Sequence, residues 1–526
     1  MKEIKELKFE DLTLKQKLGM VYCATVSGRT SKENVEFVRN LIANHSLGAI
    51  WVQWSNAGTD ELLKMVKETA DYPILIFTDA ENGILNYQIG KHNAVGCTDN
   101  EELAYAFGKT VGVTARNMGY SFVCNPVLDI KENGWTRSLG SDKYKIAKLG
   151  AAIARGLHDA GVLSCAKHYP SSVDIEELDS HLAEPCSVQT KEELLDHSLY
   201  AYRELIKEDL LDAIMPGHHR LVNIDPDAPA SLSKPVLDVL RDEGFDGIYI
   251  TDALCMMGIL AKYGEVDCKG LAIAAGNDLA LAYDGKTQFT YGSICDCYER
   301  GMIPDDVLDK AVKRVLAAQH KLATIQPKFT ELTEEDKKTF ARINKDSVYT
   351  VLDEGVPAAI DPDGKHFFVL MARNETAVGQ DGGVLVDTFS NGWHYPAKIS
   401  AKIKELFPNS KVMIMHQFPT QGQMLEASSC SVGYDNIIFM TFTEFLAYTG
   451  PEHITKRVAN LINAMQKTDR ISTLIHFGNP KVTEELAHIK RRIYGGASAE
   501  GIDTCLEVLA GKYEAKGHPT FNVDLK

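Results

Sequence analysis

The segment GVLSCAKH, residues 161–168, is an apolar run that ends in two ionisable side chains, Lys167 and His168. Its first six residues carry no charge. Strands with such continuous hydrophobicity are buried on both faces, whereas strands with one face in water alternate apolar and polar residues. The segment therefore predicts a strand of a parallel sheet that helices cover on both sides.

Seven more runs of this kind lie between residue 20 and about residue 285. They are MVYCATV (from residue 20), GAIWVQW (48), PILIFTD (73), SFVCNPVLDI (121), LLDAIMPGH (210), DGIYITDA (246) and NDLALAYD (277). Most are separated by segments whose apolar residues recur at helical spacing, such as DKYKIAKLGAAIARGLHDAG at 142–161. Eight strands that alternate with helices predict an α/β fold with a (β/α)8-type barrel.

A second, smaller α/β unit follows the barrel. Its candidate strands are HFFVLMA (366), GVLVDTF (383), KVMIMH (411), NIIFMTF (436) and STLIHFGNP (472), and helical segments such as HITKRVANLINAMQKT (453–468) alternate with them. The stretch between the two units is rich in charge. We predict a TIM-like catalytic barrel over residues 1–330, a linker over 331–355 and a C-terminal α/β sandwich domain over 356–526.

Composition narrows the class of partner. The formal net charge of -16 argues against nucleic acid or an anionic membrane as the main partner, because both would be repelled. The first 22 residues, MKEIKELKFEDLTLKQKLGMVY, lack the apolar core of a signal peptide, and no window has about 18 uncharged apolar residues. Eleven scattered cysteines suit free thiols in a reducing compartment. We expect a cytoplasmic protein that binds a small molecule, and its oligomeric state stays open.

Reactive side chains stand at the ends of most predicted barrel strands. In a barrel these ends meet on one rim, where the catalytic groups of such enzymes lie. A single polar residue there is more often a satisfied buried group, but several on one rim indicate a site. The residues are Asp79, Asp129, Lys167, His168, His218, His219 and Asp252.

The stretch MPGHHRLVNIDPDAPASLSKPVLDVLRDEGFDGIYITDALCMMGI (215–259) resembles the nucleophile segment of glycoside hydrolase family 3. Further similarity lies in LTLKQKLG (12–19), NPVLDI (125–130), RSLGSD (137–142) and, weakly, FGNP (477–480). The resemblance covers most of the barrel and implies that Asp252 attacks the anomeric carbon of a sugar. The implied substrate is a small carbohydrate.

The segment KHYP (167–170) followed by DSHLAEP (179–185) resembles the β-N-acetylglucosaminidase branch of that family. This resemblance implies that Asp179 and His181 form the acid/base dyad. A carboxylate that binds one ring nitrogen fixes the tautomer, and the other nitrogen can then serve the leaving oxygen. By resemblance, Asp79, Arg137, Lys167 and His168 bind the sugar hydroxyls and His218 shapes the pocket.

Two segments depart from the family pattern. The branch usually has Gly-His-Gly after the proline, where this chain has SSV (171–173). The usual Glu-Gly-Gly-Arg after the strand-end aspartate is ENGI (81–84), so Asn82 replaces a glycine and Ile84 stands in place of the arginine. These changes affect the loops on the leaving-group side and leave the predicted nucleophile and dyad unchanged.

These residues are compatible with three functions. The first is a retaining exo-acting β-N-acetylglucosaminidase that cleaves peptidoglycan or chitin fragments through a covalent glycosyl-Asp252 intermediate. The second is a β-N-acetylglucosaminide phosphorylase, because a neutral histidine repels incoming phosphate less than a carboxylate does. The third is a non-catalytic sugar-binding relative, against which the complete set of Asp252, Asp179 and His181 argues. Binding of phosphate is opposed by the negative charges of Asp174, Glu176 and Glu177, which lie in the loop that carries Asp179 and His181.

No cofactor or metal is expected. No predicted strand is followed by a glycine-rich fingerprint for phosphate or dinucleotides. The adjacent His218 and His219 could bind a metal beside a carboxylate, but they lack the spacing of a zinc motif.

Overall fold

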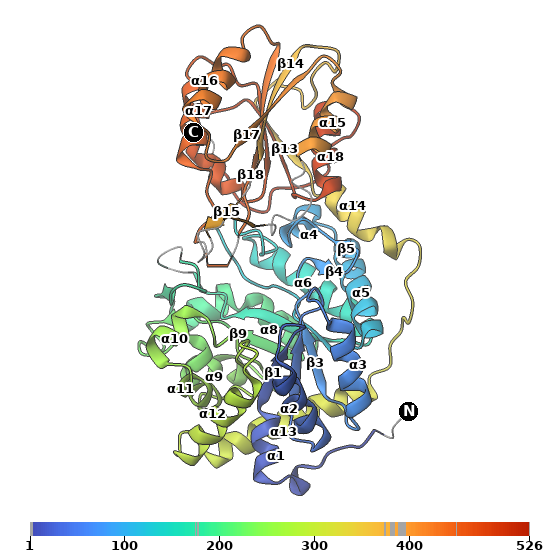
Figure 1. Ribbon diagram of the computed structural model, residues 1–526, viewed down its shortest axis with the longest axis vertical. Coiled ribbons are helices and arrows are strands. Elements are labelled where there is room, and N and C mark those ends of the chain that lie inside the picture. Colours follow the sequence, from blue (N-terminus) through green and yellow to red (C-terminus); the bar gives the residue numbers. More distant parts are fainter. Residues whose placement is uncertain are drawn as a thin grey trace.

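The computed structural model of the 526-residue chain describes residues 4–173, 175, 178–372, 375–378, 384–387, 396–445, 447–448 and 450–524. Two lobes are stacked along the long axis of the molecule, with the N-terminal part of the chain below and the C-terminal part above (Figure 1). No helix in the described part of the chain is long and apolar enough to cross a membrane.

Eight parallel strands form the lower sheet. Seven lie within the predicted runs, and β7 extends one residue beyond its run. Their order is β11-β9-β7-β6-β3-β2-β1-β12, and a parallel bridge between Ile250 and Leu279 joins the two ends of the described sheet. The barrel prediction is therefore confirmed. The strands are β1 (Tyr22–Val26), β2 (Ala49–Val52), β3 (Leu75–Thr78), β6 (Phe122–Val123), β7 (Leu163–Tyr169), β9 (Ala213–Pro216), β11 (Ile248–Tyr249) and β12 (Ala280–Leu281).

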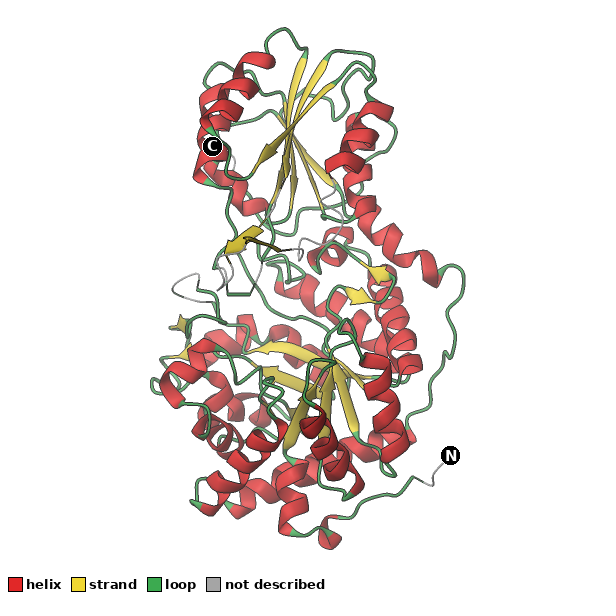
Figure 2. Ribbon diagram, viewed as in Figure 1, coloured by secondary structure: helices red, strands yellow, loops and turns green. Residues whose placement is uncertain are grey.

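Helices surround this sheet, as Figure 2 shows. The side chain of Asp142 caps α6 by accepting hydrogen bonds from the backbone of Tyr144 and Lys145. Helices α5 and α6 pack closely because Gly108 leaves room: a Cβ there would lie 2.1 Å from the carbonyl oxygen of Ile153. The helices are α1 (Leu14–Met20), α2 (Lys32–Ala43), α3 (Thr59–Thr69), α4 (Asn93–Thr98), α5 (Glu101–Met118), α6 (Lys143–Asp159), α7 (Lys191–Glu193), α8 (Tyr200–Lys207), α9 (Lys234–Asp242), α10 (Met257–Tyr263), α11 (Asp267–Ala274), α12 (Thr287–Glu299) and α13 (Asp305–Thr324).

Two small strand pairs decorate the barrel. The hairpin of β4 (Gly83–Ile84) and β5 (Tyr87–Gln88) follows β3. The parallel pair of β8 (Cys186–Ser187) and β10 (Arg220–Leu221) ties the chain after residue 185 to the segment after β9. Both pairs come from loops that follow barrel strands.

The upper lobe is a six-stranded sheet with helices on both sides (Figure 1). Its order within the described residues is β13-β20-β19-β18-β14-β17, parallel except for the edge strand β13. The strands are β13 (Tyr349–Leu352), β14 (His366–Ala372), β17 (Lys411–His416), β18 (Asn436–Phe442), β19 (Thr473–Phe477) and β20 (Arg491–Gly495). The helices are α15 (Pro396–Leu406), α16 (Gln421–Cys430), α17 (Lys456–Gln466) and α18 (Ala499–Leu509), while α14 (Thr339–Asp346) lies between the lobes, with Phe340 and Ile343 in the barrel core.

Four of the five candidate strands of this lobe lie in its main sheet. The run at 383 instead gives β16 (Val384–Asp387), which pairs with β15 (Glu375–Val378) in a separate hairpin. Strand β20 was not predicted. Strand β13 lies in the stretch predicted as linker, and the predicted domain bounds stay a prediction.

Each lobe has its own hydrophobic core among the described residues, one between Leu18 and Ile343 and the other between Val348 and Ala510. The chain beyond α18 returns to the barrel. There the backbone of His518 donates to the carbonyl of Cys97 (2.8 Å), and the backbone of Ser141 donates to the carbonyl of Thr520 (3.1 Å). The two lobes are therefore joined at several points far apart in the sequence.

Candidate active site

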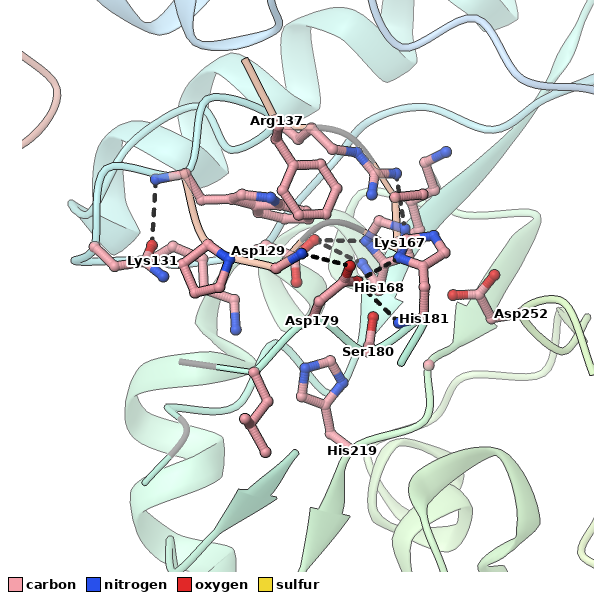
Figure 3. A pocket seen from close by; sticks show the side chains of 18 of the residues that line it. Asp129, Lys131, Arg137, Lys167, His168, Asp179, Ser180, His181, His219 and Asp252 are labelled. Atoms are coloured by element: carbon pink, nitrogen blue, oxygen red, sulfur yellow. Dashed lines mark hydrogen bonds and ion pairs between the residues drawn. The ribbon is translucent and has the colours of Figure 1, made fainter. Parts of the chain in front are cut away.

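A cavity of about 780 Å³ opens at the carboxyl ends of the barrel strands. Its barrel side contains the predicted residues Asp79, Asp129, Arg137, Lys167, His168, Asp179, His181 and Asp252, and Figure 3 shows most of them facing one space. Its upper side comes from the second lobe, including Phe445, Tyr448, Glu452 and Asn479. The structure thus brings together side chains from nearly every predicted strand end.

Asp252 lies just after β11 at the barrel end of the cavity. Its backbone nitrogen donates to the carbonyl of Pro216 (2.9 Å), and its Oδ1 accepts a hydrogen bond from the backbone of Ala253 (2.7 Å). Burial alone would raise the pKa of Asp252, but His168, His218, this backbone N–H and His181 lower it to about 2. Asp252 is therefore an ionised carboxylate in a defined orientation.

Lys167, at the end of β7, joins two carboxylates. Its Nζ lies 2.6 Å from Oδ1 of Asp79 and 2.5 Å from Oε1 of Glu81. Arg137 grips Glu81 with two nitrogens, of which Nε lies 2.8 Å from Oε2. Burial opposes ionisation of Glu81, but Arg137 and Lys167 hold its pKa well below the usual range. These groups form a fixed charged floor that can bind sugar hydroxyls.

His168 connects this floor to Asp129. Its Nδ1 lies 2.8 Å from Oδ2 of Asp129, and its backbone nitrogen donates to the same oxygen (3.0 Å). The Nη2 of Arg137 lies 3.2 Å from Nε2 of His168. Because arginine can only donate, Nε2 is the acceptor and Nδ1 carries the proton given to Asp129. The ring is therefore held in one tautomer.

Asp179 and His181 lie in the loop after β7 and line the same cavity. Oδ1 of Asp179 lies 2.7 Å from Nδ1 of His181 and also accepts a hydrogen bond from the His181 backbone (3.0 Å). The second oxygen, Oδ2, accepts from the backbone of Gly450 in the upper lobe (3.4 Å). With Nδ1 bound to the carboxylate, Nε2 of His181 is the ring nitrogen left for chemistry. Asp174, Glu176 and Glu177 lie outside the described residues.

His218 lies beside the backbone of the predicted nucleophile segment. Among the described residues that line the cavity, His219 is one and His218 is not. His218 is fully buried, with Nδ1 2.7 Å from the Ser231 hydroxyl and Nε2 3.1 Å from the Ala253 carbonyl. Burial lowers the pKa of His218, so the neutral ring donates from Nε2 to Ala253. His218 thus supports the backbone beside Asp252, and its role in shaping the pocket stays a prediction.

Residues 11–318 match the glycosyl hydrolase family 3 N-terminal domain, which amounts to more than half of the chain. The chain belongs to glycoside hydrolase family 3. It is thus an enzyme of the glycoside hydrolase type.

Two curated relatives are similar to this family 3 enzyme over part of its length. A beta-hexosaminidase of Tolumonas auensis is 31% identical over 240 residues, which make up 43% of this chain and 71% of the relative. A beta-N-acetylglucosaminidase/beta-glucosidase of Cellulomonas fimi is 26% identical over 329 residues, which make up 58% of this chain and 57% of the relative.

Solved structures match over nearly the whole chain. A glycoside hydrolase family 3 beta-N-acetylglucosaminidase from Paenibacillus sp. str. FPU-7 has a TM-score of 0.78 at 25% identity, covering 97% of this chain and 99% of that one. A beta-glucoside phosphorylase bound to 2FGlc has a TM-score of 0.81 at 20% identity, covering 98% and 95%. At 20% identity, the similarity to the phosphorylase shows a shared fold only.

The segments that depart from the family pattern have structural roles in this family 3 enzyme. The hydroxyl of Ser171 accepts a hydrogen bond from the backbone of Ile130 (2.8 Å), which braces the loop that carries Asp129. Ile84 is fully buried in the barrel core. Asn82 and Ile84 are not among the described residues that line the cavity. Ser171, Asn82 and Ile84 therefore act on loop shape, whereas Val173 of the SSV segment also lines the cavity.

Glu81 and the upper-lobe residues that line the cavity were not predicted as site residues. A signal for Glu81 existed, because it lies two residues beyond the strand-end Asp79. The FGNP segment pointed weakly to Asn479, whose side-chain nitrogen donates to the carbonyl of Asn133 in the barrel (3.0 Å). Phe445, Tyr448 and Glu452 lie in no motif that we identified. In the described part of the chain, no three His, Cys, Asp or Glu side chains form a group suited to a metal ion.

Proposed function

We propose that this enzyme is a retaining exo-acting β-N-acetylglucosaminidase that acts on terminal N-acetyl-β-glucosaminides. The observation that carries the proposal is the Asp179–His181 pair, with 2.7 Å between Oδ1 and Nδ1, in the same cavity as the ionised Asp252. Support for the sugar comes from the beta-hexosaminidase and beta-N-acetylglucosaminidase relatives. Chitin or peptidoglycan fragments would supply such substrates.

In the first step, Asp252 forms a bond to the anomeric carbon as the bond to the leaving oxygen breaks. Protonated His181 gives its Nε2 proton to that oxygen, so the aglycone departs as a neutral alcohol. Asp179 accepts from Nδ1 throughout and stabilises the imidazolium. The products of this step are the free aglycone and a glycosyl ester on Asp252.

In the second step, water attacks the anomeric carbon and the ester bond to Asp252 breaks. Neutral His181 accepts a proton from the attacking water at Nε2, which restores the imidazolium. The sugar leaves with its original β configuration because each step inverts the anomeric carbon once.

Four residues of the barrel are proposed to hold the sugar in both steps. They are Asp79, Lys167, Arg137 and His168. Lys167 and Arg137 contact Glu81, Asp79 pairs with Lys167, and His168 is bound to Asp129. A polar site of this kind discriminates strongly, because a missing hydroxyl would leave buried groups unpaired. We expect deoxy substrates to be poor.

The test is product analysis on an aryl N-acetyl-β-glucosaminide, with and without phosphate. We expect free N-acetylglucosamine as the main product in both cases, with modest activation by phosphate at most. Sugar 1-phosphate as the main product at physiological phosphate would identify a phosphorylase instead. Absence of turnover on every N-acetylglucosaminide, with turnover on a glucoside, would show that the sugar is wrong.

A further inference from the structure

A loop of the second lobe, residues 443–450, reaches from β18 to the acid/base dyad; we call it the bridging loop. Residues 446 and 449 lie outside its described part. Its first residue is tied to β19 and the loop that follows. The backbone of Thr443 donates to the carbonyl of Phe477 (2.8 Å), and the backbone of Asn479 donates to the Thr443 hydroxyl (3.1 Å).

The far part of the bridging loop touches both members of the dyad. The ring of Tyr448 lies 5.3 Å from the His181 ring, and the ring of Phe445 lies 6.1 Å from it, measured between centroids. The backbone of Gly450 donates to Oδ2 of Asp179, the oxygen that His181 does not use. These contacts constrain the plane of the imidazole and the carboxylate that orients it.

An ion pair fastens the bridging loop to the barrel. Nζ of Lys91 lies 3.0 Å from Oε1 of Glu444, and these side chains are only 20% and 5% exposed. Removing Lys91 takes away a cation that lies next to a carboxylate only 5% exposed, which weakens the attachment of the bridging loop to the barrel. The pair is therefore able to control where the bridging loop rests.

The barrel segment that carries Lys91 is itself firmly held. The backbone of Gly90 donates to Oδ1 of Asn344 (3.0 Å). Nδ1 of His92 donates to the carbonyl of Glu81 (2.8 Å), and burial lowers the pKa of His92 to about 4, so its ring is neutral near pH 7. The residues on both sides of Lys91 are thus held by hydrogen bonds to other parts of the chain.

We propose that Lys91 and Glu444 are positioning residues for general acid catalysis: their ion pair holds the bridging loop against Asp179 and His181. This inference rests on the proposed function of the dyad. Neither residue touches the reacting atoms in this scheme. Their effect is on how well Nε2 of His181 is aimed at the leaving oxygen.

The experiment compares Lys91→Met, Glu444→Gln, the double variant and the charge swap Lys91→Glu/Glu444→Lys. For each, kcat/KM is measured on aryl N-acetyl-β-glucosaminides of graded leaving-group acidity and on diacetylchitobiose. Because kcat/KM reports the first step, it shows directly how much that step depends on the proton from His181. Lys310→Met serves as control, since Lys310 forms an exposed pair with Asp306 on α13 (2.9 Å).

We expect kcat/KM of the single variants to fall about 10- to 100-fold on diacetylchitobiose and less than about threefold on the most activated aryl substrate. The double variant should lose no more than either single variant, because both remove one interaction. The charge swap should recover part of the loss. Lys310→Met should behave as wild type.

Equal losses on all leaving groups, or no loss, would overturn the proposal. If a variant unfolds early in a thermal melt, the near-isosteric Glu444→Gln and the charge swap still decide the question. Failure of the proposed function looks different: the wild-type enzyme would then release N-acetylglucosamine from none of these substrates.

Discussion

Nζ of Lys167 lies 2.5 Å from Oε1 of Glu81, so the lysine at the end of β7 is paired with a carboxylate that follows β3. Asp79 shares the same ammonium, and Arg137 holds Glu81 from its other side. The charges in this group are interdependent. Loss of Glu81 would leave two cations, the buried Lys167 and the half-buried Arg137, facing the carboxylate of Asp79.

Glu81→Gln should lower kcat/KM on aryl N-acetyl-β-glucosaminides about 100-fold, which corresponds to about 2.7 kcal/mol. Arg137 and Lys167 would shift, and the sugar hydroxyls would lose their partners. The loss should be the same for good and poor leaving groups, since Glu81 transfers no proton. Glu426→Gln, an exposed change on α16, is the matched control. Unchanged kinetics of Glu81→Gln would contradict the role of the charged floor.

Asp252→Ala should reduce turnover by several orders of magnitude with little change in thermal unfolding, because it removes the nucleophile. An activated fluorosugar that traps the intermediate should add its mass to the peptide that contains Asp252. A label on any other peptide would remove Asp252 from this role. Because the pKa of Asp252 is about 2, the carboxylate stays ionised above pH 4, so kcat/KM should show no ionisation of Asp252 from pH 4 upward.

His181→Ala should slow substrates with poor leaving groups far more than activated phenyl glycosides, since only the former need a proton in the first step. Asp179→Ala should show the same trend more weakly, because the imidazole remains. The measurement is a plot of kcat/KM against leaving-group acidity for each variant. Parallel plots for wild type and His181→Ala would mean that His181 binds or orients substrate instead.

Glu452 should make the second lobe less stable as pH rises. Burial raises the pKa of Glu452 to about 7 from an ordinary value of 4.5, so the folded state binds its proton more tightly than the unfolded chain does. Stability then falls between about pH 4.5 and 7, by up to about 3 kcal/mol. Glu452→Gln carries no charge and should show a smaller fall.

The check is urea unfolding of Glu452→Gln and wild type at pH 4 and pH 8. The free energy of unfolding of Glu452→Gln minus that of wild type should be more positive at pH 8 than at pH 4. The same difference at both pH values would mean that Glu452 does not titrate with a raised pKa.

The barrel could be predicted because a parallel strand that is buried on both faces needs a continuous apolar run, and each of the eight strands has such a run. Strand β20 could not, since it begins with Arg491 and Arg492, which are nonetheless buried. Arg491 is satisfied by the carbonyl of Pro357 (2.8 Å) and the hydroxyl of Thr473 (2.9 Å), both distant in sequence. Such partners leave no local pattern.

The candidate site likewise contains residues that the sequence pattern predicts and residues that it does not. Strand-end residues such as Asp79, Lys167 and Asp252 could be grouped because a parallel barrel brings those ends to one rim. The turn after β9 decides which of His218 and His219 faces the cavity, and no sequence pattern predicts the conformation of that turn. Gly450 lies 271 residues from Asp179, so their contact could not be read from spacing.

The hydrogen bond between Ser141 and Thr520 joins residues 379 positions apart, and Cys97 meets His518 in the same way. During synthesis on the ribosome, the strands and helices of the barrel emerge long before these partners exist. The barrel surface around Cys97 and Ser141 therefore stays uncovered until the last elements of the upper lobe have been translated. Chaperones would find their binding opportunity in that interval.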